Sequence, residues 1–343
     1  MTVRPESSHL AAAAGSSGVS SEGTGASANP TRAVRSSRSV PELAALVVVL
    51  GGLVVYFSIA SPYFLATNNI LNILTAIAVT GILAVPGTML LIAGQVDLSV
   101  GAGTALCGVI LALMAPDVGI GIAVVIALLA GVAIGLINGT LVTVIGVNSL
   151  IVTLGGLAAF RGAAYLFADG QTVLLLGFGS LGTDRPLGIP MPVILLTVVA
   201  VLVFLVLKYT VFGRHVYAIG SNPVAARLVG IPSRRVVFAT FAASGAAMAL
   251  AGLILTSQLS AATPNAALGL ELTVVTAIVL GGASLNGGRG SVVGTIIGLM
   301  IIGVLNNGLT LLNVSSYWQQ VASGVLLVVA VSFDRLRERF SPA

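Results

Sequence analysis

Charged side chains are scarce in this 343-residue chain: Asp, Glu, Lys and Arg make up 7% of it, against 57% for hydrophobic residues. Soluble domains carry charge on about a quarter of their residues, so the composition excludes an ordinary soluble domain. Cysteine and histidine are scarcer still. A single cysteine, Cys107, excludes an internal disulfide and a multi-cysteine metal site. The two histidines, His9 and His215, belong to no Ser–His–Asp or HExxH pattern, so we expect no catalytic, cofactor or metal site.

The basic residues are concentrated in three short segments, which hold twelve of the fifteen Lys and Arg. Positive charge resists transfer across a membrane, so such segments beside spanning helices stay cytoplasmic. They flank apolar spans and form no stripe, so the net charge of +5 does not indicate a nucleic-acid partner. The pattern predicts cytoplasmic termini and one cytoplasmic loop. The twelve residues are Arg4, Arg32, Arg35 and Arg38, then Lys208, Arg214, Arg227, Arg234 and Arg235, and finally Arg335, Arg337 and Arg339.

Ten apolar segments approach the ~20 residues that a membrane-spanning helix needs. Six precede the basic loop 208–235 and four follow it, and even numbers place the loop and both termini on one side. We therefore expect an all-α polytopic membrane protein with a transmembrane domain over 41–334. Disordered and basic cytoplasmic tails are expected over 1–40 and 335–343. The segments are Leu43–Ala60, Ile70–Ala93, Leu98–Ala115, Ile120–Ile137, Leu150–Phe167, Val193–Leu207, Val236–Leu255, Leu272–Leu280, Val292–Leu312 and Gln319–Val331.

The eighth segment, Leu272–Leu280, is too short to span a bilayer and runs into a glycine-rich stretch over 281–290. Non-helical backbone at membrane depth is stable only where protein or water satisfies it. We therefore expect a broken or re-entrant half-helix, followed by an irregular loop that lines a cavity. Residues 94–103 match 281–290 in the pattern G-x-x-x-L-x-x-G-x-G. Internal duplication and chance similarity in a glycine-rich chain both remain open.

The basic loop contains a short helix with both ends marked. Asn222 suits the N-cap, Pro223 the first helical position, and Gly230 the position just after the helix. So short a helix is marginal in water, so it must pack against this protein or a cytoplasmic partner. Small Ala225 and Ala226 would allow a partner to approach closely, and we expect Ala226 to lie on that docking face. A plain connector remains the alternative.

Several spaced motifs resemble ribose-type ABC sugar permeases over roughly Leu43 to Asp334. This resemblance implies that the loop helix docks into a cytoplasmic ATPase subunit. The coupling residues would be Gly220, Asn222, Pro223, Ala225, Ala226, Leu228 and Gly230. The motifs, in order, are Asp97-Leu-Ser-Val-Gly101, Thr153-Leu154-Gly155, Thr210-Val-Phe-Gly213-Arg214, Tyr217-Ala-Ile-Gly220-Ser-Asn222-Pro-Val-Ala225-Ala226, Gly230-Ile231, Glu271-Leu272 and Ser284-Leu285-Asn-Gly287-Gly288-Arg-Gly290.

The resemblance implies a permease subunit in a bacterial plasma membrane that imports a monosaccharide or small polyol. Its partners would be ATPase subunits, a second permease copy or paralogue, an extracytoplasmic solute-binding protein and membrane lipid. ATP and magnesium would bind the ATPase subunit, since this chain has no G-x-x-x-x-G-K-[ST] loop. The family usually has glycine at the positions of Gln95 and Ser221, an aromatic residue at Leu270 and often an acid at Thr273. These departures weaken any transfer of solute identity.

Two acids in the membrane region, Asp97 and Glu271, are candidates for a solute path or gate. A buried carboxylate is costly and should be paired, protonated or facing water. We favour the alternative that each caps the helix it precedes or opens, since a carboxylate there satisfies free N–H groups. Proton coupling through either acid would instead make the protein a secondary transporter of a small polar solute.

Uncharged polar residues within or beside the spans could bind hydroxyl groups along a path. Hydrogen bonding between helices is the structural alternative for each of them. The candidates are Asn138, Asn148, Thr153, Ser284, Asn306, Asn307 and Gln319, with Gln320 beside them.

Overall fold

The computed structural model describes residues 39–340, which fold into helices at all ten predicted segments. The predicted tail 1–40 lies outside the described residues apart from its last two. Within the described range the fold is all-α and polytopic, as predicted, and eight helices are long and apolar enough to cross a membrane. The ten helices are α1 (Ser39–Ala60), α2 (Thr67–Ile92), α3 (Val100–Val118), α4 (Ile120–Thr140), α5 (Ser149–Phe167), α6 (Met191–Tyr209), α9 (Ser233–Leu259), α10 (Leu270–Leu280), α11 (Val292–Leu311) and α12 (Ser316–Phe340).

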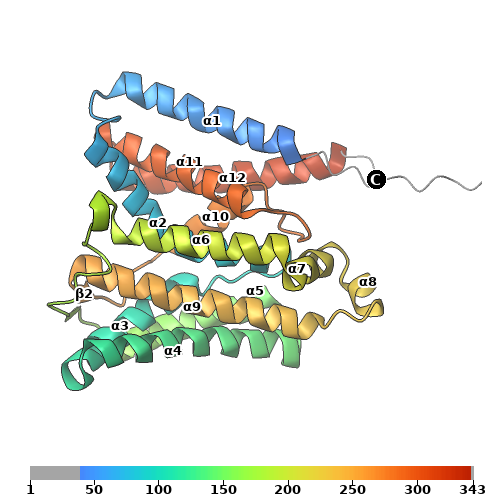
Figure 1. Cartoon of the computed structure of the whole chain (residues 1–343), viewed down its shortest axis with the longest axis horizontal. Coiled ribbons are helices and arrows are strands. Elements are labelled where there is room, and N and C mark those ends of the chain that lie inside the picture. The colour runs from blue at the N-terminus through green and yellow to red at the C-terminus, as the bar shows by residue number, and fades with distance from the viewer. Residues whose placement is uncertain (1–38, 341–343) are drawn as a thin grey trace, which may run out of the picture. The chain divides into compact units, whose positions relative to one another are not determined.

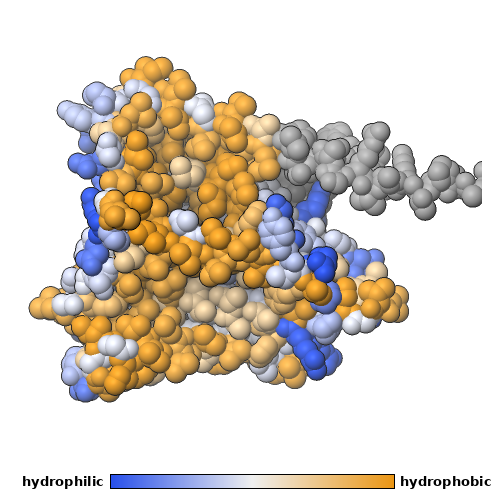
Figure 2. All heavy atoms as spheres, viewed as in Figure 1, coloured by the Kyte–Doolittle hydropathy of each residue, from blue (hydrophilic) through white to orange (hydrophobic). Residues whose placement is uncertain are grey.

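The basic loop forms two further helices, α7 (Val211–Ser221) and α8 (Pro223–Leu228). They lie at the end of the bundle where α1 begins and α12 ends (Figure 1). The even count of segments on each side of the loop predicts this arrangement. Hydrophobic side chains cover the bundle between its ends, and hydrophilic ones gather at both ends (Figure 2). Helix α12 continues through 335–340 without a break, and 341–343 lie outside the described residues.

Three helices form the centre of the bundle. In α2, α3 and α9, between 67% and 78% of the most apolar stretch is buried, compared with 6% in α1 and 22% in α5 and α6. Cys107 of α3 is fully buried, in agreement with a packing role. The exposed faces of α1, α5 and α6 are apolar, which suits contact with lipid or with another membrane subunit.

Irregular backbone interrupts the bundle at two places, of which the glycine-rich stretch over 281–290 was predicted. Residues 93–99 are non-helical between α2 and α3, and 281–291 are non-helical between α10 and α11. Helix α10 has 11 residues, so the expected half-helix is confirmed. The stretch 281–290 lies wholly between α10 and α11, whereas 94–103 begins in the irregular segment and continues into the first turn of α3.

Short elements in the connections were not predicted. Two antiparallel strands, β1 (Val173–Leu174) and β2 (Ala261–Ala262), join the connections after α5 and after α9. The π-helix η1 (Leu141–Ile145) ends α4, and the 3₁₀ turn η2 (Pro186–Gly188) precedes α6. Elements of two to five residues carry too little periodicity to be read from sequence.

Candidate functional site

Helix α8 has the boundaries that its sequence predicts. The Asn222 Oδ1 atom accepts hydrogen bonds from the backbone N–H groups of Val224 (3.1 Å) and Ala225 (3.0 Å), so it caps the helix. Pro223 occupies the first helical position. Gly230, with a φ of 80°, ends the segment in the left-handed conformation that favours glycine. Local side-chain chemistry thus defines a single-turn projection at the end of the bundle.

The predicted docking face of α8 is wrong. Ala226 is only 3% exposed and packs inward on the body of this protein. Val224, Leu228 and Val229 point outward and are 65%, 84% and 75% exposed. A partner would therefore meet these larger apolar side chains, and arginine at Ala226 would disturb the fold before it disturbed docking.

Helix α7 connects α8 to both irregular membrane loops. A Cβ on Gly220 would overlap the backbone of Ile92 and Gly288, so α7 approaches both segments as closely as backbone allows. The Gly288 N–H donates to the Ile92 carbonyl oxygen at 2.8 Å. The Tyr217 hydroxyl donates to the Gly290 carbonyl oxygen at 2.9 Å. Burial raises the pKa of Tyr217, which keeps its hydroxyl a donor. We call this contact of α7 with 92–95 and 284–290 the glycine junction.

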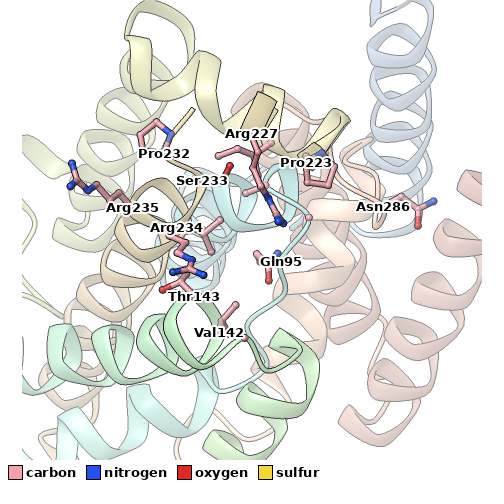
Figure 3. A pocket seen from close by; sticks show the side chains of 16 residues that line it. Gln95, Val142, Thr143, Pro223, Arg227, Pro232, Ser233, Arg234, Arg235 and Asn286 are labelled. Atoms are coloured by element: carbon pink, nitrogen blue, oxygen red, sulfur yellow. The ribbon is translucent and has the colours of Figure 1, made fainter. Parts of the chain in front are cut away.

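A basic cavity of about 930 Å³ opens beside the glycine junction. Arg227 and Arg234 point into it, toward Gln95 and Thr143, while Arg235 extends away (Figure 3). Among the described residues, no acidic side chain lines the cavity. Its charge therefore suits a partner surface that carries Asp or Glu.

Asp97 is the centre of a buried hydrogen-bond cluster. Its Oδ1 atom accepts from the Ser99 N–H (3.0 Å) and hydroxyl (2.6 Å), and its Oδ2 atom accepts from the Ser244 hydroxyl (2.9 Å). The Asn138 amide donates to the Ser99 hydroxyl at 2.9 Å. Helix α3 begins at Val100 with Ser99 as its N-cap residue, so the cap predicted at Asp97 is wrong. The carboxylate instead ties the loop 93–99 to α9, and the Ser99 hydroxyl ties it to α4.

Three further candidates make local hydrogen bonds. Asn148 caps α5 by accepting from the Leu150 N–H at 2.9 Å. The Thr153 hydroxyl donates to the Ser149 carbonyl oxygen at 2.8 Å and is fully buried. Ser284 is buried, and its N–H donates to the Arg289 carbonyl oxygen at 3.1 Å. These bonds of Asn148 and Thr153 lie at the end of a helix or within it, so they are not the bonds between helices that the structural alternative expects.

Glu271 lies in the first turn of α10, two residues after the N-cap residue Gly269, so the predicted cap is wrong here as well. Its Oε2 atom is buried and has no hydrogen-bond partner among the described residues. Arg161 of α5 lies close enough for charge attraction and donates to the carbonyl oxygens of Pro264 and Ala266. Arg161 was not among the predicted site residues, although a lone charge inside a predicted span is a detectable signal.

The adjacent asparagines of α11 have different environments. Asn307 forms a reciprocal amide pair with Asn69 of α2, with both N–O distances 2.9 Å. Asn306 and Gln319 instead line a cavity of about 620 Å³ between α10, α11 and α12. The structure thus brings these two candidates together and separates them from the Asp97 cluster.

Comparison with known proteins identifies the relatives of this chain. One family model, described as branched-chain amino acid transport system / permease component, matches residues 69–331. The ribose import permease protein RbsC of Haemophilus influenzae is 40% identical over 82% of this chain and 90% of its own length. RbsC of Bacillus subtilis is 42% identical over 82% and 89%. The L-arabinose ABC transporter permease protein AraH of Azospirillum brasilense is 37% identical over 85% and 87%. No solved structure matched significantly.

Proposed function

Because this chain belongs to the family described as branched-chain amino acid transport system / permease component, we propose that it provides the membrane path of a bacterial importer for a monosaccharide or similar small polyol. Relatives named for ribose and arabinose import support a sugar as the solute. Separate ATPase subunits would bind ATP and magnesium and drive transport. A second permease copy or paralogue and an extracytoplasmic binding protein would complete the importer.

The observation that carries this proposal is the exposed apolar face of α8 above the glycine junction. A side chain such as Leu228, 84% exposed in an aqueous compartment, is best explained by a groove on a partner that buries it. Full burial of a leucine side chain contributes about 1.5–3 kcal/mol to such an association. The basic cavity next to α8 would attract acidic residues around that groove and orient the partner.

Movement of the docked ATPase subunits would then reach the membrane through backbone contacts. Helix α8 follows α7 directly, and Gly220 of α7 lies against Gly288 of the second irregular loop and against Ile92, the last residue of α2 before the first loop. Because no flexible side chain separates these backbones, a displacement of α7 must shift 92–95 and 284–290 together. The helices attached to these loops would then move, so that the solute path closes on one side of the membrane and opens on the other.

Docking is tested by Leu228→Arg in a co-expressed importer. The arginine should abolish co-purification of the cognate ATPase subunit, because a charge replaces the apolar contact. Leu187→Arg is the matched control, since Leu187 is 98% exposed in η2 at the opposite end of the bundle. Both variants should elute as folded protein. Undiminished ATPase in the Leu228→Arg complex would refute the assignment of α8.

The energy source is tested by sugar uptake into reconstituted vesicles. ATP on the ATPase side should drive uptake of D-ribose or L-arabinose only when the ATPase subunits are present. Uptake that follows a proton gradient without them would instead support the secondary transporter, with Glu271 as the group to test.

A further inference from the structure

A polar cavity between three of the membrane helices is the feature that the coupling mechanism leaves unexplained. It has a volume of about 620 Å³ and lies between α10, α11 and α12, far along the sequence from the Asp97 cluster. None of its described lining residues is charged. Its hydrogen-bonding side chains are Thr273, Thr276, Asn306, Ser316, Gln319, Gln320 and Ser323. Lipid tails cannot satisfy such groups, so water or a polar solute must occupy the space.

The cavity presents hydrogen-bond acceptors. The Oδ1 atom of Asn306 is buried without a partner among the described residues. The hydroxyl of Thr276 donates to the Leu272 carbonyl oxygen, and that of Thr273 donates to the Gly269 carbonyl oxygen, which leaves their oxygen lone pairs available. A ligand that supplies O–H donors would complete these sites, and an unsatisfied buried acceptor is unfavourable.

The lining of the cavity also includes the apolar side chains of Leu268, Leu270 and Leu272. A ring that carries hydroxyl groups at its edge and C–H groups on its faces matches this combination. An anion would find no basic side chain here, and a cation would find no carboxylate. The chemistry selects a small, neutral, hydroxyl-rich molecule.

We propose that this cavity contacts the transported polyol in the membrane, with Asn306 as a hydrogen-bond acceptor for one of its hydroxyl groups. This inference rests on the proposed import function and adds a place on the path. The neighbouring Asn307 provides a comparison within the same helix turn, because its amide is already paired with Asn69.

The first test compares Asn306→Ala with Asn307→Ala in the complete reconstituted importer. Asn306→Ala should assemble normally but lower ATP-driven uptake of D-ribose, or of the sugar that the wild type takes up fastest, about tenfold, as expected for one lost hydrogen bond. Asn307→Ala should instead lower the yield and melting temperature of the complex. Wild-type uptake in the Asn306→Ala importer would overturn the proposal; absence of uptake in the wild type would count against the import function itself.

The second test holds even if Asn306→Ala folds poorly. Cys107 is fully buried and gives little background, so a cysteine introduced at Thr273, a half-buried residue that lines the cavity, can be probed with a charged, water-soluble thiol reagent. Thr273→Cys should react, and the transported sugar should slow the reaction. Val325→Cys, 57% exposed on α12 outside the cavity, is the lipid-facing control and should stay unreactive. A Thr273→Cys reaction that the sugar does not slow would refute the contact.

Discussion

Replacement of Gly220 by alanine tests the mechanical role of the glycine junction. The new Cβ would lie 2.5 Å from the Gly288 nitrogen and closer still to the Ile92 carbonyl oxygen. Both neighbours are backbone atoms, so no side chain can rotate away, and α7 must move. We expect Gly220→Ala to separate α7 from both irregular loops.

The cost follows from the contacts that such a movement breaks. The Tyr217–Gly290 hydrogen bond would lengthen or be lost, and it contributes about 0.5–1.5 kcal/mol to stability. The close packing of α7 against Ile92 and Gly288 would be lost as well. Alanine favours a helix over glycine by about 0.5–1 kcal/mol, which offsets part of this loss. A decrease of about 2–4 °C in melting temperature for each kcal/mol lost is expected.

Thermal unfolding of the purified importer and ATP-driven sugar uptake measure the two consequences. Gly220→Ala should lower the melting temperature and reduce the sugar imported for each ATP hydrolysed. Gly51→Ala in α1 is the matched control, because nothing lies within 4 Å of a Cβ at Gly51. If the two variants were equally stable and equally coupled, α7 would not transmit motion through this contact.

Two further predictions concern hydrogen bonds at the irregular loops. Asp97→Ala leaves Ser99 and Ser244 without their acceptor and should destabilise the protein by about 1–3 kcal/mol in thermal unfolding, whereas Asp97→Asn keeps one acceptor oxygen and should cost less. A change in sugar preference with normal folded yield for Asp97→Asn would show instead that Asp97 contacts the solute. Tyr217→Phe removes the bond to Gly290, so stability should fall by about 0.5–1.5 kcal/mol and coupling should weaken; coupling equal to wild type would exclude a role for this bond.

The membrane segments could be predicted because their signals are local. Apolarity and length identify a span without knowledge of its neighbours, and all ten predicted segments are helices. The half-length of α10 was also visible, since glycines 281 and 282 end the apolar run. The strand pair β1–β2 was not, because it joins residues 173–174 to 261–262 through two-residue elements.

Helix α8 shows where local prediction ends. Capping depends on residues a few positions apart, so Asn222 and Gly230 gave its limits. The orientation of its faces depends on what α8 packs against, which the local sequence does not encode. A small Ala226 turned out to face this protein's own body, and the larger Leu228 faces outward. The small side chain of Ala226 allows α8 to pack closely against the rest of this chain. The sequence had suggested that it would allow a partner protein to pack closely against α8.

The polar candidates required tertiary information for the same reason. Asp97 and Ser244 are 147 residues apart, and nothing near either position indicates the pairing. Asn306 and Asn307 are the same residue type at adjacent positions of α11. Their side chains point to different sides of the helix, so Asn306 lines a cavity and Asn307 binds Asn69 of α2. Only Arg161 carried an available signal, as the single charge within the predicted span Leu150–Phe167.

The matching glycine stretches gain a physical meaning from their contact. A Cβ on Gly287, in the second stretch, would come within 2.9 Å of the Gly94 backbone in the first. The same Cβ would lie 3.1 Å from the Gly220 carbonyl oxygen. The two irregular loops and α7 therefore meet at one point, where side chains are absent on all three sides. Because the two loops and α7 are in direct backbone contact, the proposed coupling predicts that a displacement of α7 moves both loops together.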